Sequence, residues 1–545
     1  MPVYDRRSPD GPAAQHVPAA ADRTPVRGLP APPAPSGELT PPADRRRAPI
    51  LAVPDRSAAA GWATVLWPVA VLGHLAANPG HLVAGDGIGG LQLVLVGLAG
   101  ALVARPGRLL AGGLAGLYLL VFWLKLPAVG NHEVILALVA LGMLWGLADR
   151  RPGWTVRAAP VCRAALIVSY GFIALSKFNR GFLDPAVSCA TLFGDEVGHL
   201  FGLRPGGDTA AALIVIWATA LVEAAIPALL VIRPARKSGR GGDRFPPHPS
   251  AANDVRRRRT RRRGAPPLRT VGVLLALSFH FLLALDPSAH VWDFSSSLLP
   301  LFLLFLPVGF HHRLDRFVAR WRARPPVERA ASLGLVVAVQ GLALAGPLPD
   351  WFPAYPLWLA LGGAVTVAAT HHMLLGRGGR GPLIGAVPVG QRRRWSRGVA
   401  LVVLLGVANG LAPYAELRTA AAFNMYSNLR ILDGESNHLL VPALPLGLDR
   451  PLAAVVDPPA GSELAYYDVA GMVVPMENLE RYAAARPEES VVARVGEEPA
   501  RLVTPGAQPG LVGRLVGGLE HKLAFRRAVD GAEPARCLRS WGPIG

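Results

Sequence analysis

Residues 209–232, TAAALIVIWATALVEAAIPALLVI, are the most informative segment of the sequence for the class of fold. It is apolar from end to end, with Glu223 as its single ionisable residue. About 20 consecutive apolar residues are enough to cross the hydrocarbon core of a bilayer as a helix. The stretch therefore predicts a transmembrane helix, and similar apolar stretches recur on both sides of it, from Gly61 to Pro413.

These stretches predict an all-α polytopic transmembrane helical bundle of about 11 spans. A small β-rich (α+β) soluble C-terminal domain follows the bundle, because residues 415–545 mix acids, bases and Gly-rich turns with short β-type runs. In that domain, LAYYDVAGMVV (464–474) and SVVARV (490–495) predict strands, and ENLERYAAAR (477–486) predicts a helix. The predicted spans lie near residues 62–77, 88–104, 109–124, 133–148, 163–177, 209–232, 269–285, 295–310, 330–346, 354–374 and 398–413.

The composition agrees with a membrane protein. Apolar residues make up 51% of the chain and charged residues only 17%, against a usual quarter for soluble proteins. The mean hydropathy is +0.33. Charged groups are scarce in such chains because an ionisable group in hydrocarbon costs several kcal/mol.

The Lys and Arg residues that give the chain its net charge of +19 are concentrated in certain loops, and their distribution predicts the membrane topology. Cytoplasmic loops are enriched in Lys and Arg. With the N-terminus inside, the predicted inside loops are the basic ones, while the outside loops 78–87, 286–294 and 347–353 hold no Lys or Arg. We therefore predict a multi-pass protein of the cell membrane with a cytoplasmic N-terminus and an extracytoplasmic C-terminus. The predicted inside loops are the turn at 105–108 and residues 149–162, 233–268, 311–329 and 375–397.

Two segments are predicted to lack regular secondary structure. Residues 1–60, rich in Pro, Ala and Arg, predict a disordered cytoplasmic arm before a transmembrane domain at 61–414. Residues 234–268 predict a flexible basic cytoplasmic loop that contains RRRRTRRR (256–263). Such a run is also typical of nucleic-acid binding. A solvated loop attracted to anionic lipid is the better interpretation here, and we expect no nucleic-acid partner.

The chain has three cysteines and no CxxC motif, so neither a zinc site nor a thioredoxin-like site is predicted. On the predicted topology Cys189 and Cys537 face the same external compartment. A disulfide between them is therefore possible, although the sequence fixes no distance.

Ionisable groups inside spans are functional candidates. Lys177 ends the fifth span, where it is either an interfacial lysine that snorkels to water or a general base in an apolar cavity. Asn131 and His132 open the fourth span, either as a helix N-cap with an interfacial histidine beside it or with His132 orienting or polarising a substrate oxygen. His280 lies in the outer half of the seventh span. We expect these four residues at one level and Glu223 below them, near the midplane.

The alternative for His280 and Glu223 is a polar contact between packed helices, worth about 1 kcal/mol or less. His74, in the first span, is interpreted as a packing residue. The small residues GGLAG (112–116) predict a surface where helices approach closely.

Four segments resemble one family. GNHEVILALVAL (130–141), YGFIALSKFNRGF (170–182), SFHFLLALDPSAHVWDFSSSLLPLFLLF (278–305) and FNMYSNLRILDGESNHLLVP (423–442) are similar to segments of the HTTM membrane proteins. The vitamin K-dependent gamma-carboxylase is the characterised relative in that family. The resemblance covers most of residues 60–545 in order, through short motifs.

The resemblance implies a role for each matching residue. Lys177 matches the lysine base that deprotonates the quinol, and His132 matches an active-site histidine. Asn131 would position the quinol oxygen with His132, and His280 would line the pocket. The implied cofactor is reduced menaquinone or a vitamin K-like quinol, with no metal. The implied partners are the lipid bilayer, the lipid quinol and a secreted or membrane protein substrate.

The chain departs from the carboxylase pattern around the lysine. Ser176 stands where the carboxylase has a second lysine, and Asn179, Arg180, Gly181 and Phe182 stand where it has an acid–tryptophan stretch. The resemblance therefore implies quinol chemistry more directly than peptide glutamate as acceptor. The alternatives are a non-catalytic membrane scaffold or partner-binding protein acting through its outer domain, and a transporter. Matching pairs of broken helices, which favour a transporter, are not evident in the sequence.

Overall fold

The computed structural model describes residues 61–77, 87–126, 129–148, 153–232, 268–286, 291–329, 354–374, 392–419, 421–444 and most of 451–504, with a few further residues up to Cys537. The predicted arm at 1–60, the basic loop at 234–268 and almost all of the span predicted at 330–346 lie outside the described residues.

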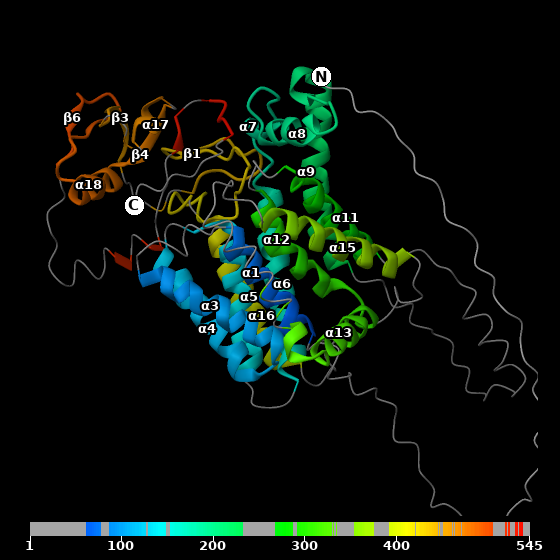
Figure 1. Cartoon of the computed structure of the whole chain (residues 1–545). Coiled ribbons are helices and arrows are strands. Elements are labelled where there is room, and N and C mark those ends of the chain that lie inside the picture. The colour runs from blue at the N-terminus through cyan, green and yellow to red at the C-terminus, as the bar shows by residue number, and fades with distance from the viewer. Residues whose placement is uncertain are drawn as a thin grey trace, which may run out of the picture. The chain divides into compact units, whose positions relative to one another are not determined.

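Helices dominate the chain as far as Leu411 (Figure 1). A π-helical turn at Trp62–Leu66 leads into the first of them. The helices are α1 (Trp67–Ala77), α3 (Gly87–Ala104), α4 (Arg108–Lys125), α5 (Asn131–Ala148), α6 (Trp154–Leu175), α7 (Arg180–Leu183), α8 (Cys189–His199), α9 (Thr209–Val231), α11 (Leu268–Leu283), α12 (Val291–Phe302), α13 (Val308–Arg322), α15 (Ala354–Leu374) and α16 (Arg392–Leu411).

Among the described residues, four helices are long and apolar enough to cross a membrane: α4, α5, α6 and α9. Six shorter apolar helices, among them α3 and α11, coincide with further predicted spans. The prediction of a mainly helical, membrane-associated chain is therefore confirmed. The count of about 11 crossings and the orientation of the termini stay predictions.

Helix α6 packs against α5, α16 and α9, and α5 and α16 also contact each other. Glycines make the α5–α6 approach close. A Cβ atom added at Gly142 would lie 2.8 Å from Cys162 Sγ, and one at Gly146 would lie 2.6 Å from Trp154 O. The close surface predicted at GGLAG (112–116) is wrong, because Cβ atoms at Gly112 and Gly113 would make only ordinary contacts of 3.8 and 3.9 Å.

Two predicted loops are partly helical. α6 begins at Trp154, so Arg157 lies in a helix rather than in the predicted loop 149–162. Its guanidinium Nε donates a hydrogen bond to Gly146 O at 3.2 Å, which accommodates a charge beside the end of α5. α13 occupies most of the predicted loop 311–329, and its Arg322 donates to Val103 O at 2.9 and 3.0 Å.

The C-terminal part is α+β, as predicted. A two-stranded ribbon pairs β1 (Ile431–Leu432) with β2 (Glu435–Ser436). The strands of a five-stranded antiparallel sheet, in the order β6-β5-β3-β4-β7, are β3 (Leu452–Asp457), β4 (Met472–Pro475), β5 (Val492–Val495), β6 (Arg501–Leu502) and β7 (Val529–Asp530).

Two helices accompany this sheet: α17 (Leu464–Val469) and α18 (Met476–Ala485). The helix predicted at 477–486 is confirmed by α18, and the strand predicted in SVVARV is confirmed by β5. The first half of LAYYDVAGMVV is the helix α17, so the strand prediction was wrong there. Leu464 and Tyr467 of α17 are buried with Ala453 of β3, in an apolar core that this sheet and its helices build for themselves.

Candidate functional site

Lys177 follows the last turn of α6 and is buried, with 3% of its surface exposed. Its Nζ lies 3.2 Å from Glu223 Oε2 and donates to Met425 O at 3.0 Å and to Tyr426 O at 3.4 Å. The amine also lies over the Phe182 ring, 5.3 Å from its centroid. The interpretation of Lys177 as an interfacial lysine that reaches water is therefore wrong in this structure.

Glu223 comes to this lysine from α9. That helix begins at the N-cap Asp208, whose Oδ1 accepts from the backbone N–H groups of Ala210 and Ala211 at 2.7 and 3.1 Å. The carboxylate of Glu223 is buried and lies in contact with the amine. We expected Glu223 below the other candidates, whereas its side chain reaches the level of Lys177.

A cavity of about 430 Å³ adjoins this pair. Its wall is mostly apolar, and its charged groups are Lys177 and Glu223. The ring of His280 and the side chain of Tyr426 add polar edges. Phe201, Leu203 and Leu282 line the cavity and are 62%, 61% and 47% exposed, so its mouth is apolar as well.

His280 is oriented by two hydroxyl groups. Ser295 Oγ donates to His280 O at 3.1 Å, which leaves its lone pairs to accept from His280 Nδ1 at 3.4 Å. Nε2 is then the acceptor of the Tyr170 hydroxyl at 2.7 Å. The imidazole is thus held as one neutral tautomer at the cavity wall, and the tautomer is assigned from this hydrogen-bond network.

The segment 424–428 closes one side of the cavity through Met425 and Tyr426. Tyr426 has φ of +49°, a left-handed conformation that is uncommon for an aromatic residue. This conformation accompanies the placement of two successive carbonyl groups at the lysine. Burial, followed by the charges of Asp293 and Glu196, raises the pKa of Tyr426 to about 12, so its phenol is protonated at neutral pH.

His132 and Asn131 do not line this cavity. Asn131 is the first helical residue of α5 and is buried, so the cap predicted at Asn131 is wrong: Gly130 precedes the helix, and its O accepts from the N–H of Val134. His132 faces His74 of α1, with 2.9 Å between Nε2 and Nδ1, and Asp293 of α12, with 3.2 Å between Nε2 and Oδ2. The structure therefore brings Lys177, Glu223 and His280 together and places His132 in a second polar cluster.

The ring of Phe294 connects the two groups. It lies 6.3 Å from the His132 ring and 5.4 Å from the His280 ring, centroid to centroid, and it lines the cavity. Asp293, the residue before it, belongs to the second cluster. Adjacent residues of α12 thus contribute to the two sites.

Sequence reasoning missed four polar residues at these sites. Tyr170 and Asp293 were not singled out, and His74 was interpreted as packing. Glu133 caps α5, because its Oε2 accepts the Gly130 N–H at 2.6 Å. Its spacing from Gly130 is the usual signal for a glutamate that caps a helix start.

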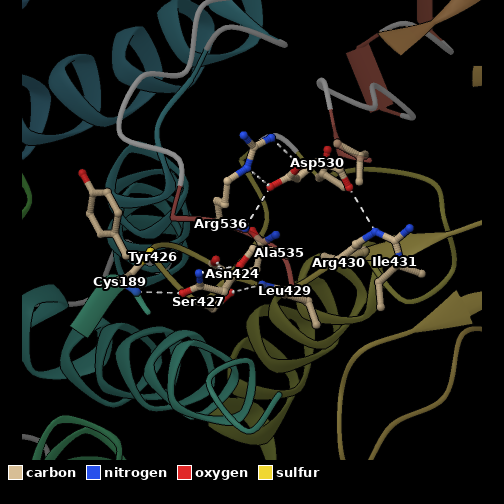
Figure 2. A pocket seen from close by; sticks show the side chains of 14 residues that line it. Cys189, Asn424, Tyr426, Ser427, Leu429, Arg430, Ile431, Asp530, Ala535 and Arg536 are labelled. Atoms are coloured by element: carbon tan, nitrogen blue, oxygen red, sulfur yellow. Dashed lines mark hydrogen bonds and ion pairs between the residues drawn. The ribbon is translucent and has the colours of Figure 1, made fainter. Parts of the chain in front are cut away.

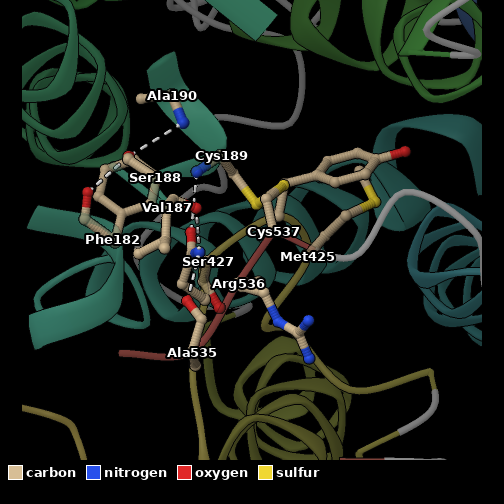
Figure 3. The surroundings of a disulfide bond; sticks show 12 residues. Phe182, Val187, Ser188, Cys189, Ala190, Met425, Ser427, Ala535, Arg536 and Cys537 are labelled. Carbon is tan, nitrogen blue, oxygen red and sulfur yellow. Dashed lines mark hydrogen bonds between the residues drawn. A yellow bond between two sulfur atoms is a disulfide. The ribbon is translucent and has the colours of Figure 1, made fainter. Parts of the chain in front are cut away.

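A disulfide joins the start of α8 to the C-terminal tail, with 4.9 Å between the Cα atoms of Cys189 and Cys537 (Figure 3). The pairing that the sequence left open is thus present. Around it, Asn428 Oδ1 accepts from Cys189 N at 2.9 Å. Its Nδ2 donates to Val187 O at 2.8 Å and to Ala535 O at 2.9 Å.

The tail is also held by charge. The Arg536 guanidinium donates to both carboxylate oxygens of Asp530, and Arg430 Nε donates to Asp530 O at 3.0 Å (Figure 2). These residues surround a small cavity of about 50 Å³ beside the Cys189 backbone. Its size and its internal ion pair fit a docking contact for the tail better than a ligand site.

Comparisons with known proteins found no relative of this chain. No protein-family model, no curated protein and no solved structure matches the chain. The resemblance to the HTTM family therefore stays a prediction from the four quoted segments.

Proposed function

We propose that this chain is an integral membrane protein that binds a lipid quinol and promotes its oxidation, in the manner of the carboxylase-like family that it resembles. The reduced menaquinone or vitamin K-like quinol would occupy the cavity lined by Lys177, Glu223 and His280. The observation that carries the proposal is a buried amine–carboxylate pair in the wall of an apolar cavity of about 430 Å³.

The shape and polarity of the cavity suit such a ligand. Sites for small molecules usually measure about 300–1,000 Å³ and combine apolar walls with a few polar groups. A quinol ring would present its hydroxyl groups to the polar wall. Its prenyl tail would leave past the exposed apolar mouth at Phe201 and Leu203.

The contacts of Lys177 define how it would act as a base. Two carbonyl oxygens accept hydrogen bonds from its Nζ, and the Glu223 carboxylate forms an ion pair with it. A lysine accepts a proton only from its neutral form. We therefore assign Glu223 as the group that takes the lysine proton, after which the neutral amine removes the hydroxyl proton of the quinol.

Oxygen and carbon dioxide chemistry would follow only as the resemblance implies. The edge of the His280 imidazole would contact the quinol ring. His132 and Asn131 do not line the cavity, so they would act from outside it, across the Phe294 ring. The proposed location is the cell membrane with the C-terminus outside. The Cys189–Cys537 disulfide supports that side, because disulfides persist in oxidising compartments.

The test uses full-length protein in detergent with menaquinol and oxygen. Lys177→Met keeps the length of the side chain and removes the amine, so we expect quinol oxidation to fall at least about 100-fold. Lys522→Met is the matched control, since that lysine contacts carbonyl groups at the end of α4 and does not line the cavity. Unchanged turnover in Lys177→Met, or none in the wild type, contradicts the proposal.

A partner-binding scaffold is the second candidate. It is favoured by a run of exposed apolar side chains after the β1–β2 ribbon: Leu439, Leu440, Leu444 and Leu446. Exposed apolar patches of this kind mark interaction surfaces. Capture of a partner by the wild type but not by Leu440→Glu, together with no quinol turnover, selects this candidate.

A further inference from the structure

A second constellation lies outside the cavity. His74 of α1, His132 of α5 and Asp293 of α12 bring their side chains to one point. His74 Nδ1 lies 2.9 Å from His132 Nε2 and 3.2 Å from Asp293 Oδ1. His132 Nε2 lies 3.2 Å from Asp293 Oδ2. Three helices far apart in the sequence thus present two imidazoles and one carboxylate to one another.

These separations match a shared metal ion. Ligand atoms at about 2.0–2.1 Å from one ion are about 2.9 Å apart at a right angle and about 3.4 Å apart at the tetrahedral angle. The separations of His74 Nδ1 from His132 Nε2 and from Asp293 Oδ1, 2.9 and 3.2 Å, lie inside that interval, while His132 Nε2 lies 3.2 Å from the other carboxylate oxygen, Oδ2. With one donor atom from each residue, the three atoms lie within 4.8 Å of one another, so the Asp293 carboxylate would turn to bring its oxygen onto the ion.

The second ring nitrogen of His74 contacts a carboxylate of its own. Its Nε2 lies 3.1 Å from Glu133 Oε1, and a carboxylate there accepts the Nε2–H. With an ion bound, Nδ1 carries the lone pair, whereas without one Asp293 Oδ1, at 3.2 Å, is placed to accept an Nδ1–H. A metal-bound histidine usually donates its other N–H to a carboxylate or carbonyl in this way. Glu133 is in turn held by Lys125 and by the Gly130 N–H.

The charges of the site are compatible with a bound cation. Asp293 and Glu133 are two carboxylates, and Lys125 is one ammonium group beside Glu133. With both imidazoles neutral, these groups sum to one negative charge. Either a proton on His74, whose two ring nitrogens each face a carboxylate oxygen, or a divalent ion with a bound hydroxide makes the cluster neutral, and neutrality is favoured in a buried place.

We propose that His74, His132 and Asp293 form a binding site for one divalent first-row transition-metal ion. Two imidazoles and a carboxylate select Zn²⁺, Fe²⁺ or Co²⁺ over Mg²⁺ and Ca²⁺, which prefer sites made of oxygen alone. Three protein ligands leave coordination positions for water or another small ligand. The site shares His132 with the quinol proposal, but it goes beyond that proposal, and its test does not depend on quinol turnover.

The experiment uses full-length protein without a histidine tag, stripped with a chelator and titrated with Co²⁺. We expect about one equivalent to bind and to give visible d–d absorption, which Zn²⁺ then displaces. His74→Ala and Asp293→Asn should each weaken binding at least about 10–100-fold. Asp293→Asn keeps the side-chain volume and so guards against a folding failure in the alanine variant.

His199→Ala is the matched control, because that histidine is exposed and distant in sequence from the cluster, and it should bind Co²⁺ as the wild type does. Wild-type protein that binds less than about half an equivalent, or cluster variants that bind normally, overturns the site. The stoichiometry is read without any turnover, so a failure of the quinol proposal leaves this result intact.

Discussion

Asn428 connects three backbone segments through one side chain. It accepts from Cys189 N and donates to Val187 O and Ala535 O. Its φ of +54° is a conformation that Asn and Asp tolerate better than most residues. The residue therefore combines a backbone requirement with a hydrogen-bond requirement.

Asn428→Asp separates these two requirements. The aspartate keeps the size, the backbone preference and the acceptor for Cys189 N, but it replaces both donors with oxygen. Two buried carbonyl groups lose their partner and face a negative charge, so we expect a loss of about 2–4 kcal/mol of stability. Thermal unfolding in detergent measures it, with the exposed Glu435→Gln as control. Equal melting of Asn428→Asp and the wild type would refute the contact.

Among the helices, α16 owes its position to glycines. A Cβ atom at Gly406 would lie 2.4 Å from Val168 Cγ1, and one at Gly410 would lie 2.2 Å from Phe172 Cγ. Both contacts are made to α6, the helix that leads into Lys177. Close approach of α16 to α6 is therefore one of the packing contacts that fix the helix before the candidate base.

Gly406→Ala tests this contact. The added methyl group meets a β-branched side chain with little rotamer freedom, so we expect a net loss of about 1–3 kcal/mol in spite of the better helix propensity of alanine. Gly97→Ala in α3 is the matched control, because open space surrounds that position, and it should be neutral or slightly stabilising. Unfolding temperatures in the same detergent compare the two. A Gly406→Ala protein as stable as Gly97→Ala would contradict the close packing.

The local sequence pattern predicted which segments form helices and strands better than it predicted which of these elements pack together. Apolar runs such as 209–232 indicate helices because the bilayer demands internal backbone hydrogen bonds. The helix α17 was missed because LAYYDV is rich in aromatic and β-branched residues, and burial of Leu464 and Tyr467 against the sheet overrides that preference. The close helix-packing surface was predicted at GGLAG (112–116) in α4, whereas close contacts lie at Gly142 and Gly146 of α5. Small residues in a sequence do not indicate which helix will pack against them.

The same limit applies to the sites. Lys177, Glu223 and His280 are conspicuous as polar residues within apolar runs, and they share one cavity. His74 and Asp293 are conspicuous only once α1, α5 and α12 are packed together. A lone histidine in a span carries no sign of its partners, so the second cluster could not be read from the sequence.

In the folded chain as a whole, His438 links the C-terminal segment to the end of α6. Its Nε2 donates to Leu175 O at 2.8 Å, and its Nδ1 accepts from the N–H groups of Leu440 and Val441, each at 3.0 Å. This pattern needs the neutral imidazole. Burial lowers the pKa of His438 below its ordinary value of about 6.5, against a smaller opposite effect of the Leu175 carbonyl.

The sign of the resulting pH dependence follows from proton binding. Between the lowered pKa of the folded chain and about 6.5, the unfolded chain binds more protons at His438 than the folded chain does. The free energy of unfolding therefore rises with pH through that window, and the contribution of this histidine is fully present above it. On acidification the Nδ1 proton faces two N–H donors. We expect the folded chain to lose about 1–2 kcal/mol at this contact as the pH falls from 7.5 through the window.

His438→Gln isolates that contribution, because glutamine keeps a polar side chain and does not titrate. Thermal unfolding of the full-length protein in detergent, followed from pH 7.5 downward, should show a smaller acid loss in the variant than in the wild type. His199→Gln removes an exposed histidine and should leave the profile unchanged. If His438→Gln lost stability on acidification as steeply as the wild type does, protonation of His438 would not be the cause of that loss, and the prediction would be wrong.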